Sequence, residues 1–159
     1  MKKLDKRRRR ENKTNYLKRL ILLKSDTPRL IVRKTNRYII LQIVESDKAQ
    51  DKVIVSVNTK ELLKYGWPKE NVGSLKSLSA AYLAGILIAK KSVNKKIKEC
   101  ILDSGLIPST KGSRIYACVK GAIDGGLKIP HDKNILPTND MINKYSFLDK
   151  IKKNIEDKK

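Results

Sequence analysis

The sequence contains few of the side chains on which enzymes and metal sites are usually built. Among 159 residues it has two cysteines, one histidine, one tryptophan and one phenylalanine. Cys100 and Cys118 are too few for a disulfide framework or a zinc site, so we expect two reduced, buried thiols of an intracellular protein. Spacing gives His131 no catalytic partner, so we expect it to have a structural role at the surface. We therefore predict no catalytic residue, no metal site and no cofactor.

Long apolar runs are also missing. The longest uncharged apolar stretch, Ala80 to Ala89, is far shorter than the roughly 20 residues that span a bilayer. Near the N-terminus, the apolar run 21–23 is followed at once by Lys24, so no signal-peptide core is present. We expect no membrane span and no membrane partner. With 40% hydrophobic residues the chain can still bury a core, and its length suits about one domain.

Acidic residues are scarce, and this shortage dominates the composition. Thirty-seven Lys and Arg oppose 16 Asp and Glu, which gives a net charge of +21. Such self-repulsion favours an anionic partner over a small neutral substrate. Residues 1–24 alone hold 11 basic and two acidic side chains. A block of this kind is typically disordered until phosphate neutralises it. It can bind a polyanion directly, or serve as a solubilising tail or a localisation signal.

Hydrophobic patterning predicts one α/β domain, with the elements in the order strand, strand, strand, helix, strand, helix. In chain order, the expected elements are an amphipathic helix within 13–24, a hairpin over 29–44 with a cationic tip, a polar loop at 47–52, a strand at 53–57, a helix from 78 to about 98 capped by Ser77 or Ser79, a strand at 100–102, and a helix over 113–124 closed by two glycines. Three strands in succession predict an antiparallel meander. The helix crossover makes the fourth strand parallel.

This order predicts a mixed sheet with packed helices and three regions. Residues 1–24 form a basic arm with a short helix, 25–128 form the α/β core, and 129–159 form an extended C-terminal tail. We expect the tail to wrap the surface and its residues 150–159 to be disordered.

The strongest local motif is the run 110–114, Thr-Lys-Gly-Ser-Arg. It connects a predicted strand to a helix, so backbone amides, a hydroxyl and two cations meet at a helix N-terminus, which favours phosphate. It is not a nucleotide-binding P-loop, because the second glycine of that motif is missing. An ordinary capped turn is the alternative interpretation.

The predicted hairpin carries a second cationic set. Arg29 and Arg33 share one face, because side chains alternate along a strand, and Lys34 and Arg37 flank the tip. A projecting hairpin with a cationic rim can follow a nucleic-acid backbone, although a solvated tip is also possible. Aromatic residues make up 5% of the chain and are not clustered, so a base-stacking sheet is not expected. Structured RNA fits this pattern better than a sequence-read single strand.

Two other functions stay open at this point. A metal-dependent nuclease needs several carboxylates that converge on divalent ions. Glu45, Asp103 and Asp124 are too scattered for that, and chance placement explains them better. The other alternative is a non-specific nucleic-acid packaging protein.

Several motifs occur in an order that resembles one family. They are the runs 7–20 and 28–36, Tyr65-Gly66-Trp67, the helix 80–91, the run 102–106, the run 110–114 with 120–122, and the run 126–131. In this order they are similar to the large-subunit ribosomal protein family called L-eighteen in bacteria and archaea and L-five in eukaryotes, which binds 5S ribosomal RNA. The resemblance spans roughly residues 6–140, and the basic opening looks like the archaeal form.

The resemblance implies a ribonuclease-H-like core that serves as an RNA scaffold without catalytic carboxylates. It implies a place in the central protuberance of the cytoplasmic ribosome, where the family helps to attach 5S RNA to the large-subunit RNA beside neighbouring ribosomal proteins. Under this hypothesis the RNA-contacting residues are Arg7, Arg8, Arg9, Arg10, Lys13, Thr14, Tyr16, Lys18, Arg19, Arg29, Arg33, Lys34, Asn36, Arg37, Lys111, Gly112, Ser113 and Arg114.

The sequence departs from the family pattern at three places. Asn12 replaces a glycine and Asn15 an aspartate in the opening motif, which changes the flexibility and charge of the arm but spares its cations. The usual Gly-Glu-His element is missing from residues 141–147. The contacts of the C-terminal tail therefore stay open.

Overall fold

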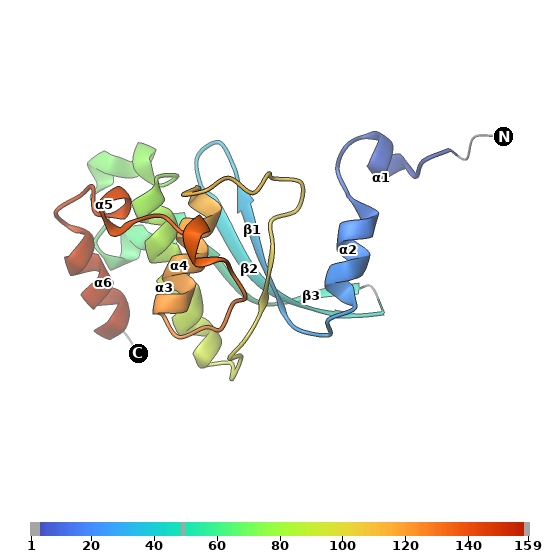
Figure 1. Ribbon diagram of the computed structural model, residues 1–159. Coiled ribbons are helices and arrows are strands. Elements are labelled where there is room, and N and C mark those ends of the chain that lie inside the picture. Colours follow the sequence, from blue (N-terminus) through green and yellow to red (C-terminus); the bar gives the residue numbers. More distant parts are fainter. Residues whose placement is uncertain (1–3, 49, 158–159) are drawn as a thin grey trace.

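The computed structural model describes residues 4–48 and 50–157 (Figure 1). Its elements are α1 (Arg7–Arg10), α2 (Tyr16–Leu23), β1 (Arg29–Lys34), β2 (Ile39–Asp47), β3 (Gln50–Asn58), the 3₁₀ helices η1 (Thr59–Tyr65) and η2 (Lys69–Ser74), α3 (Leu78–Val93), β4 (Ile101–Asp103), α4 (Arg114–Asp124), the 3₁₀ turn η3 (Lys133–Ile135), α5 (Asn139–Ile142) and α6 (Leu148–Asp157).

The four strands form one mixed sheet in the order β3-β2-β1-β4. The β1–β2 and β2–β3 pairs are antiparallel, while β4 runs parallel to β1. This confirms the predicted mixed sheet. The predicted loop at 47–52 is wrong, because residues 50–52 continue β3 and pair with residues 45–47 of β2. This part of the ribbon extends beyond the core with polar side chains, so it lacks the alternation of apolar residues that marks a strand.

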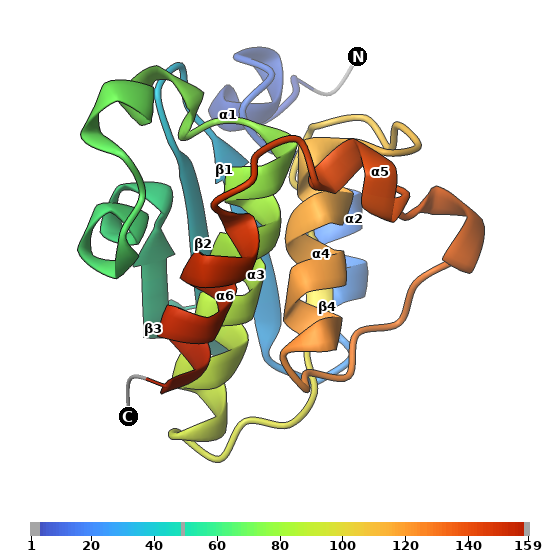
Figure 2. The same cartoon turned by 90° about the vertical axis from the view of Figure 1, so that its left-hand side faces the viewer.

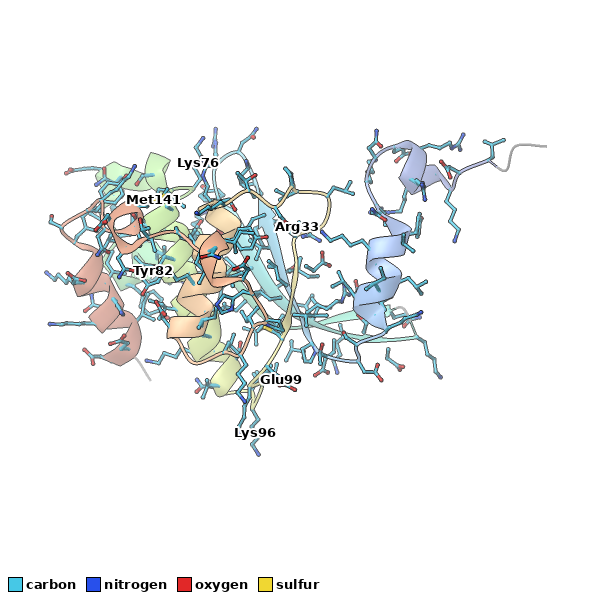
Figure 3. All side chains as sticks on the ribbon, in the orientation of Figure 1. Arg33, Lys76, Tyr82, Lys96, Glu99 and Met141 are labelled. Atoms are coloured by element: carbon cyan, nitrogen blue, oxygen red, sulfur yellow. The ribbon has the colours of Figure 1, made fainter. Side chains whose placement is uncertain are left out.

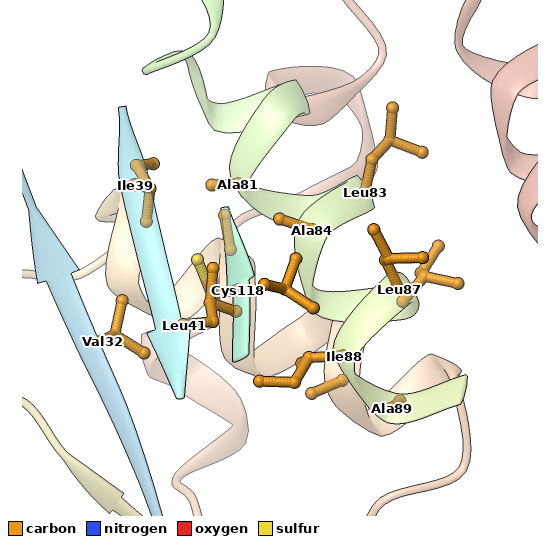
Figure 4. Packing of buried hydrophobic residues seen from close by; sticks show 14 of the residues in the cluster. Val32, Ile39, Leu41, Ala81, Leu83, Ala84, Leu87, Ile88, Ala89 and Cys118 are labelled. Atoms are coloured by element: carbon orange, nitrogen blue, oxygen red, sulfur yellow. The ribbon is translucent and has the colours of Figure 1, made fainter. Parts of the chain in front are cut away.

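Helices α3 and α4 cover one face of the sheet (Figure 2). Alternate residues of the strands, among them Val32, Ile39 and Leu41, point into this layer, and Ala81 and Ala84 of α3 lie opposite them (Figure 4). Ser77 is the N-cap of α3, because its side chain accepts a hydrogen bond from the amide of Ala80. The small residues of α3 therefore allow close packing on the sheet, as predicted.

Helix α3 is shorter than predicted. It ends at Val93 rather than near residue 98, and Lys96 has a φ of +62°. The amide of Ile97 donates to the carbonyl of Ser92, which turns the chain back so that Ile97 is buried. The lysines at 95, 96 and 98 extend the helical composition past this turn, which explains why composition alone overestimates the helix.

Two glycines let the backbones of α3 and α4 contact each other directly. A Cβ atom at Gly85 would overlap the carbonyl oxygen of Cys118, and one at Gly121 would overlap the carbonyl oxygen of Tyr82.

Both cysteine thiols, at positions 100 and 118, are free and buried, and burial raises the pKa of Cys100 to about 12. The predicted buried thiols are thus confirmed.

The C-terminal tail wraps around the outside of α3 and ends in a helix. Helix α6 buries Leu148, Ile151 and Ile155, and Lys90 of α3 donates to the carbonyls of Ile155 and Glu156 (Figure 2). The prediction of disorder over 150–159 is wrong for residues 150–157, and residues 158–159 lie outside the described range. Three apolar residues at positions i, i+3 and i+7 are enough to anchor a helix that is otherwise polar.

An aromatic cluster fixes the segment that precedes α6. Trp67 is 2% exposed, and its ring makes edge contacts with Tyr145 and Phe147 at centroid distances of 5.9 and 5.2 Å. Its indole N–H donates to the carbonyl of Asn71 at 3.0 Å. Residues 141–147, which depart from the family pattern, therefore reach the core through aromatic contacts. In the described part of the chain, no helix is long and apolar enough to cross a membrane.

Candidate nucleic-acid interface

The basic arm lies to one side of the α/β body (Figure 1). Neither α1 nor α2 contains a buried residue, and Arg7–Arg10 form a single exposed helical turn. The Nε atom of Arg7 lies 3.8 Å from a carboxylate oxygen of Glu11, and the Nε atom of Arg9 lies 3.5 Å from a carboxylate oxygen of Asp5. Exposed ion pairs of this kind are worth little, so the arginines stay available to a stronger anion.

The local geometry of the arm suits both asparagines of the opening motif. Asn12 has a φ of 50°, in the left-handed region that favours glycine and that asparagine tolerates best among the other residues. Asn15 is the N-cap of α2, and its side chain accepts a hydrogen bond from the amide of Lys18 at 3.1 Å. Asparagine and aspartate are about equally good N-caps, so both replacements keep the backbone path of the arm.

Two consecutive cations of α2 contact the body. The Lys18 ammonium donates to the hydroxyl of Ser104 at 3.1 Å and to the carbonyl of Gly105 at 3.2 Å. The Arg19 guanidinium donates to both carboxylate oxygens of Asp51, each at 3.1 Å. The sequence pattern assigns Lys18 and Arg19 to RNA, whereas the structure engages them with the protein.

Arg29 lies in the interior rather than at the surface. It is 1% exposed, and its guanidinium donates to Asp103 at 2.9 Å, to Asp51 at 2.7 Å and to the hydroxyl of Ser46 at 2.8 Å. A buried guanidinium is tolerated only where carboxylates compensate its charge, and here two of them do so. We therefore leave Arg29 out of the surface that an external anion can reach.

The cation cluster also determines the ionisation of Asp51. Partial burial by itself would raise the pKa of this carboxyl. The hydrogen bond from Ser46 and the charges of Arg29 and Arg19 outweigh that effect and lower the pKa. Asp51 is therefore a stable anion at neutral pH, held between a buried arginine and the arm.

The hairpin tip presents its cations to solvent. Thr35 closes the tip, because its hydroxyl accepts from the amide of Tyr38 at 2.9 Å and donates to the carbonyl of Tyr38 at 2.8 Å. Lys34, Asn36 and Arg37 are exposed. The tip predicted from the sequence is therefore preformed by the short loop.

Arg33 connects the hairpin to the loop after β4. Its side chain is 42% exposed and donates to the carbonyl of Asp103 at 2.9 Å and to the carboxylate of Asp103 at 3.3 Å. Arg29 binds the same carboxylate, so the prediction that Arg29 and Arg33 share a face is confirmed. Figure 3 shows Arg33 projecting toward the arm.

The run 110–114 leads into α4 as predicted. Gly112 has a φ of +66°, and its amide donates to the carbonyl of Ile135, so this amide is already used. Ser113 occupies the N-cap position but makes no capping hydrogen bond, and its hydroxyl is buried without a hydrogen-bond partner in the described structure. Lys111 is exposed.

Two hollows join the three cationic sets. A hollow of about 180 Å³ between arm and body is lined by side chains that include Arg8, Lys13, Lys18, Arg19 and Arg33. A second hollow, of about 390 Å³, brings Lys34 of the hairpin beside Thr110, Gly112, Ser113 and Arg114. The first hollow therefore connects the arm to the hairpin, and the second connects the hairpin to the turn on the other side of β1, because the side chains of Arg33 and Lys34 alternate along the strand. We call these three sets together the basic surface and define it by the exposed Arg7–Arg10, Lys13, Lys34, Arg37 and Lys111 and the half-buried Arg114.

The carboxylates considered for a nuclease lie apart and have other roles. Asp103 neutralises Arg29 and Arg33, Asp124 accepts from the hydroxyl of Tyr82 at 2.7 Å, and Glu45 is exposed on β2. Burial, together with Asp124, raises the pKa of Tyr82. Across residues 4–48 and 50–157, no group of three or more His, Cys, Asp or Glu side chains could hold a metal ion.

Sequence reasoning misses the partners of the cations. It places Asp51 in a loop, and nothing marks residues 104 and 105 as a contact point for α2. One signal in the sequence could have indicated these partners, because the few carboxylates of a strongly basic chain are expected to form ion pairs with its cations. Spacing alone cannot say which cation each carboxylate binds, because the contacts of Arg19 and Lys18 join residues 32 to 87 positions apart.

The comparisons with known proteins all give members of one protein family. A family model described as "Ribosomal large subunit proteins 60S L5, and 50S L18" matches residues 2–99 and 94–132. "Large ribosomal subunit protein uL18" of Korarchaeum cryptofilum is 52% identical over 136 residues, covering 86% of this chain and 68% of that protein. The proteins of the same name from Methanoregula boonei and Caldivirga maquilingensis are 46% and 44% identical, over 86% of this chain and 76% and 65% of their own lengths.

Proposed function

This chain belongs to the family of large-subunit ribosomal proteins that includes 60S L5 and 50S L18, and from that premise we propose that it binds 5S ribosomal RNA. It is a large-subunit ribosomal protein of archaeal type, structural rather than enzymatic, and its place is the cytoplasmic ribosome. Ribosomal RNA and other ribosomal proteins are its partners. The proposal adds 5S RNA as the primary ligand and attachment of that RNA to the large-subunit RNA, in the central protuberance, as the role.

The observation that carries the proposal is the basic surface. The sets at 7–13, 34–37 and 111–114 come from three separate parts of the chain, and two hollows, one shared by arm and hairpin and one by hairpin and turn, bring them near the hairpin. The arm helices bury no residue, so their charge is not needed to hold a core together. Three neighbouring cationic sets with few aromatics suit the phosphates and shape of a folded RNA.

In the proposed mechanism the three cationic sets have different roles in RNA binding. The arm clamps the RNA electrostatically, since Arg7–Arg10 and Lys13 are exposed and only weakly paired. The hairpin cations Lys34 and Arg37 and the turn cations Lys111 and Arg114 fix the register on the RNA backbone. Contacts to phosphate position a protein on its ligand and give affinity without reading bases.

A titration of affinity against salt tests the proposal. Purified protein is mixed with 5S RNA, and separately with duplex DNA of matched length, at several salt concentrations. We expect the logarithm of 5S affinity to fall linearly and steeply with the logarithm of salt concentration, because each neutralised phosphate releases about one counterion. We also expect 5S RNA to bind more tightly than the DNA at moderate salt. Equal affinity for both ligands would favour the packaging alternative instead.

Variants then assign the contacts. Deletion of residues 1–19 should weaken binding at moderate salt by more than about tenfold and make the salt slope shallower by about one unit for each phosphate that the arm no longer neutralises. Lys34→Ala with Arg37→Ala should reduce affinity while the fold is kept, because both side chains are exposed. The matched control is Lys95→Ala with Lys96→Ala, which removes the same charge from two exposed positions, and Figure 3 shows Lys96 far from Arg33 of the hairpin. An equal reduction of affinity in this control would contradict the assigned surface.

A further inference from the structure

The position of the arm presents an electrostatic problem. Residues 1–24 carry a net charge of +9, and residues 25–140, with 20 basic and 11 acidic side chains, also carry +9. Like charges of this size repel, and α2 has no fully buried residue, since Leu22 and Leu23 are only half-buried and give a limited hydrophobic contact. The arm nevertheless lies against the body, so specific contacts must oppose the repulsion.

Those contacts come from two adjacent side chains of α2. The Nη2 atom of Arg19 lies 3.1 Å from both carboxylate oxygens of Asp51, and the Arg19 side chain is 35% exposed against 30% for the aspartate. Lys18 reaches the hydroxyl of Ser104 and the carbonyl of Gly105. These contacts start from adjacent residues of α2 and reach two different parts of the body, β3 and the loop after β4, so together they define how the helix lies on the sheet.

Both contact points are rigid because one network holds them. Asp51 accepts from the hydroxyl of Ser46 at 2.8 Å, and the buried Arg29 joins Asp51 to Asp103. The carboxylate of Asp103 in turn accepts from the amide of Gly105 at 2.8 Å, which shapes the loop that receives Lys18. The arm thus docks onto a preorganised acidic anchor inside a basic protein.

We propose that Asp51 is a positioning residue that docks the basic arm on the body through Arg19 and thereby presents Arg7–Arg10 and Lys13 to RNA in a fixed orientation. The RNA part of this inference rests on the proposed function. A docked arm loses less freedom on binding than a free one, so docking raises affinity even though Asp51 itself touches no RNA.

The proposal makes a prediction whose sign opposes that of simple electrostatics. Removal of a negative charge from a protein that binds a polyanion should strengthen binding if charge alone matters. If Asp51 docks the arm, Asp51→Asn should instead weaken 5S RNA binding by about five-fold, the effect of removing one ion pair. Glu45→Gln is the matched control, because Glu45 is an exposed carboxylate on the neighbouring strand, opposite Lys52, and should follow simple electrostatics.

The docking itself is measured without RNA. Nitroxide labels are attached to cysteines introduced at Ile21, 61% exposed on α2, and at Lys60, exposed on η1. The native Cys100 and Cys118 are buried and should not react with the label. Pulsed electron–electron double resonance then gives the distribution of distances between the two nitroxide labels. We expect a narrow distribution for the labelled parent and for Glu45→Gln, and a broad one for Asp51→Asn.

A second variant separates docking from folding. Asp51→Asn also removes one partner of Arg29, so its melting temperature should fall, whereas Arg19→Gln leaves the Arg29–Asp51 pair in place. Arg19→Gln should broaden the distances as Asp51→Asn does, and the double variant should be no broader than either single one. Narrow distances in both single variants, or unchanged or tighter RNA binding by Asp51→Asn, would overturn the proposal. If the parent protein fails to bind 5S RNA, the proposed function falls, and the distances still decide whether the arm docks.

Discussion

Arg29 and Arg33 show how two identical residues on one face of β1 acquire different roles. Arg29 lies where the sheet, Asp51 and Asp103 enclose it, so it stabilises the interior. Arg33 lies at the other end of the strand, binds Asp103 from outside and keeps 42% of its side chain exposed. The sequence predicts the shared face, because alternation along a strand is local. It does not predict burial, because burial depends on carboxylates that are distant in the chain.

Gly85 is one of two glycines within α3 and α4 at which the facing helix leaves no space for a Cβ atom. We expect Gly85→Ala to lower the free energy of unfolding by about 3 kcal/mol, because the added methyl group would overlap the carbonyl of Cys118 and push α3 away from α4. Urea denaturation followed by circular dichroism measures the change. Gly73→Ala is the control, since a Cβ there has no neighbour within 4 Å, and it should change stability by less than about 0.5 kcal/mol. Equal effects of the two variants would show that the helices do not pack as described.

At the scale of elements, the parts that follow local rules were predictable. The meander, the parallel strand β4 and helix α4 follow from alternation, crossover length and the Gly125-Gly126 stop. The three basic sets of the interface are identified from the sequence too, although their use by RNA stays a prediction. The extended ribbon at 50–52 and the early end of α3 are missed because each depends on a tertiary contact rather than on local pattern. Helix α6 is missed although its three buried apolar residues have helical spacing, because its other residues are mostly polar and charged.

Helix α6 provides the test at this scale. Ile155 is fully buried against the rest of the core, so Ile155→Ala should cost about 3 kcal/mol of unfolding free energy and lower the melting temperature. Lys153→Ala, an exposed position on the same helix, should be neutral to within about 0.5 kcal/mol. Differential scanning calorimetry compares the two. A transition for Ile155→Ala that coincides with that of the parent protein would mean that the tail does not pack as part of the fold.

At the scale of the whole molecule, the positions of the few acidic side chains matter more than their number. Of the 16 acidic residues, Asp51 and Asp103 lie beneath the basic surface and pair with arginines, while Arg7–Arg10 and the hairpin cations stay accessible. The interior network keeps the fold together against self-repulsion, and the surface keeps its charge for an anion. The net charge of +21 is therefore balanced in the assembled particle rather than within the chain.

The most direct test of 5S RNA as the ligand starts from native ribosomes. Large subunits that carry a tagged copy of this protein are isolated and dissociated at low magnesium concentration, and the RNA retained on the tag is sized and sequenced. We predict one 5S-sized RNA in an amount about equal to that of the protein, and its disappearance when residues 1–19 are deleted. Recovery of fragments of the large ribosomal RNA without 5S RNA would contradict the proposed function.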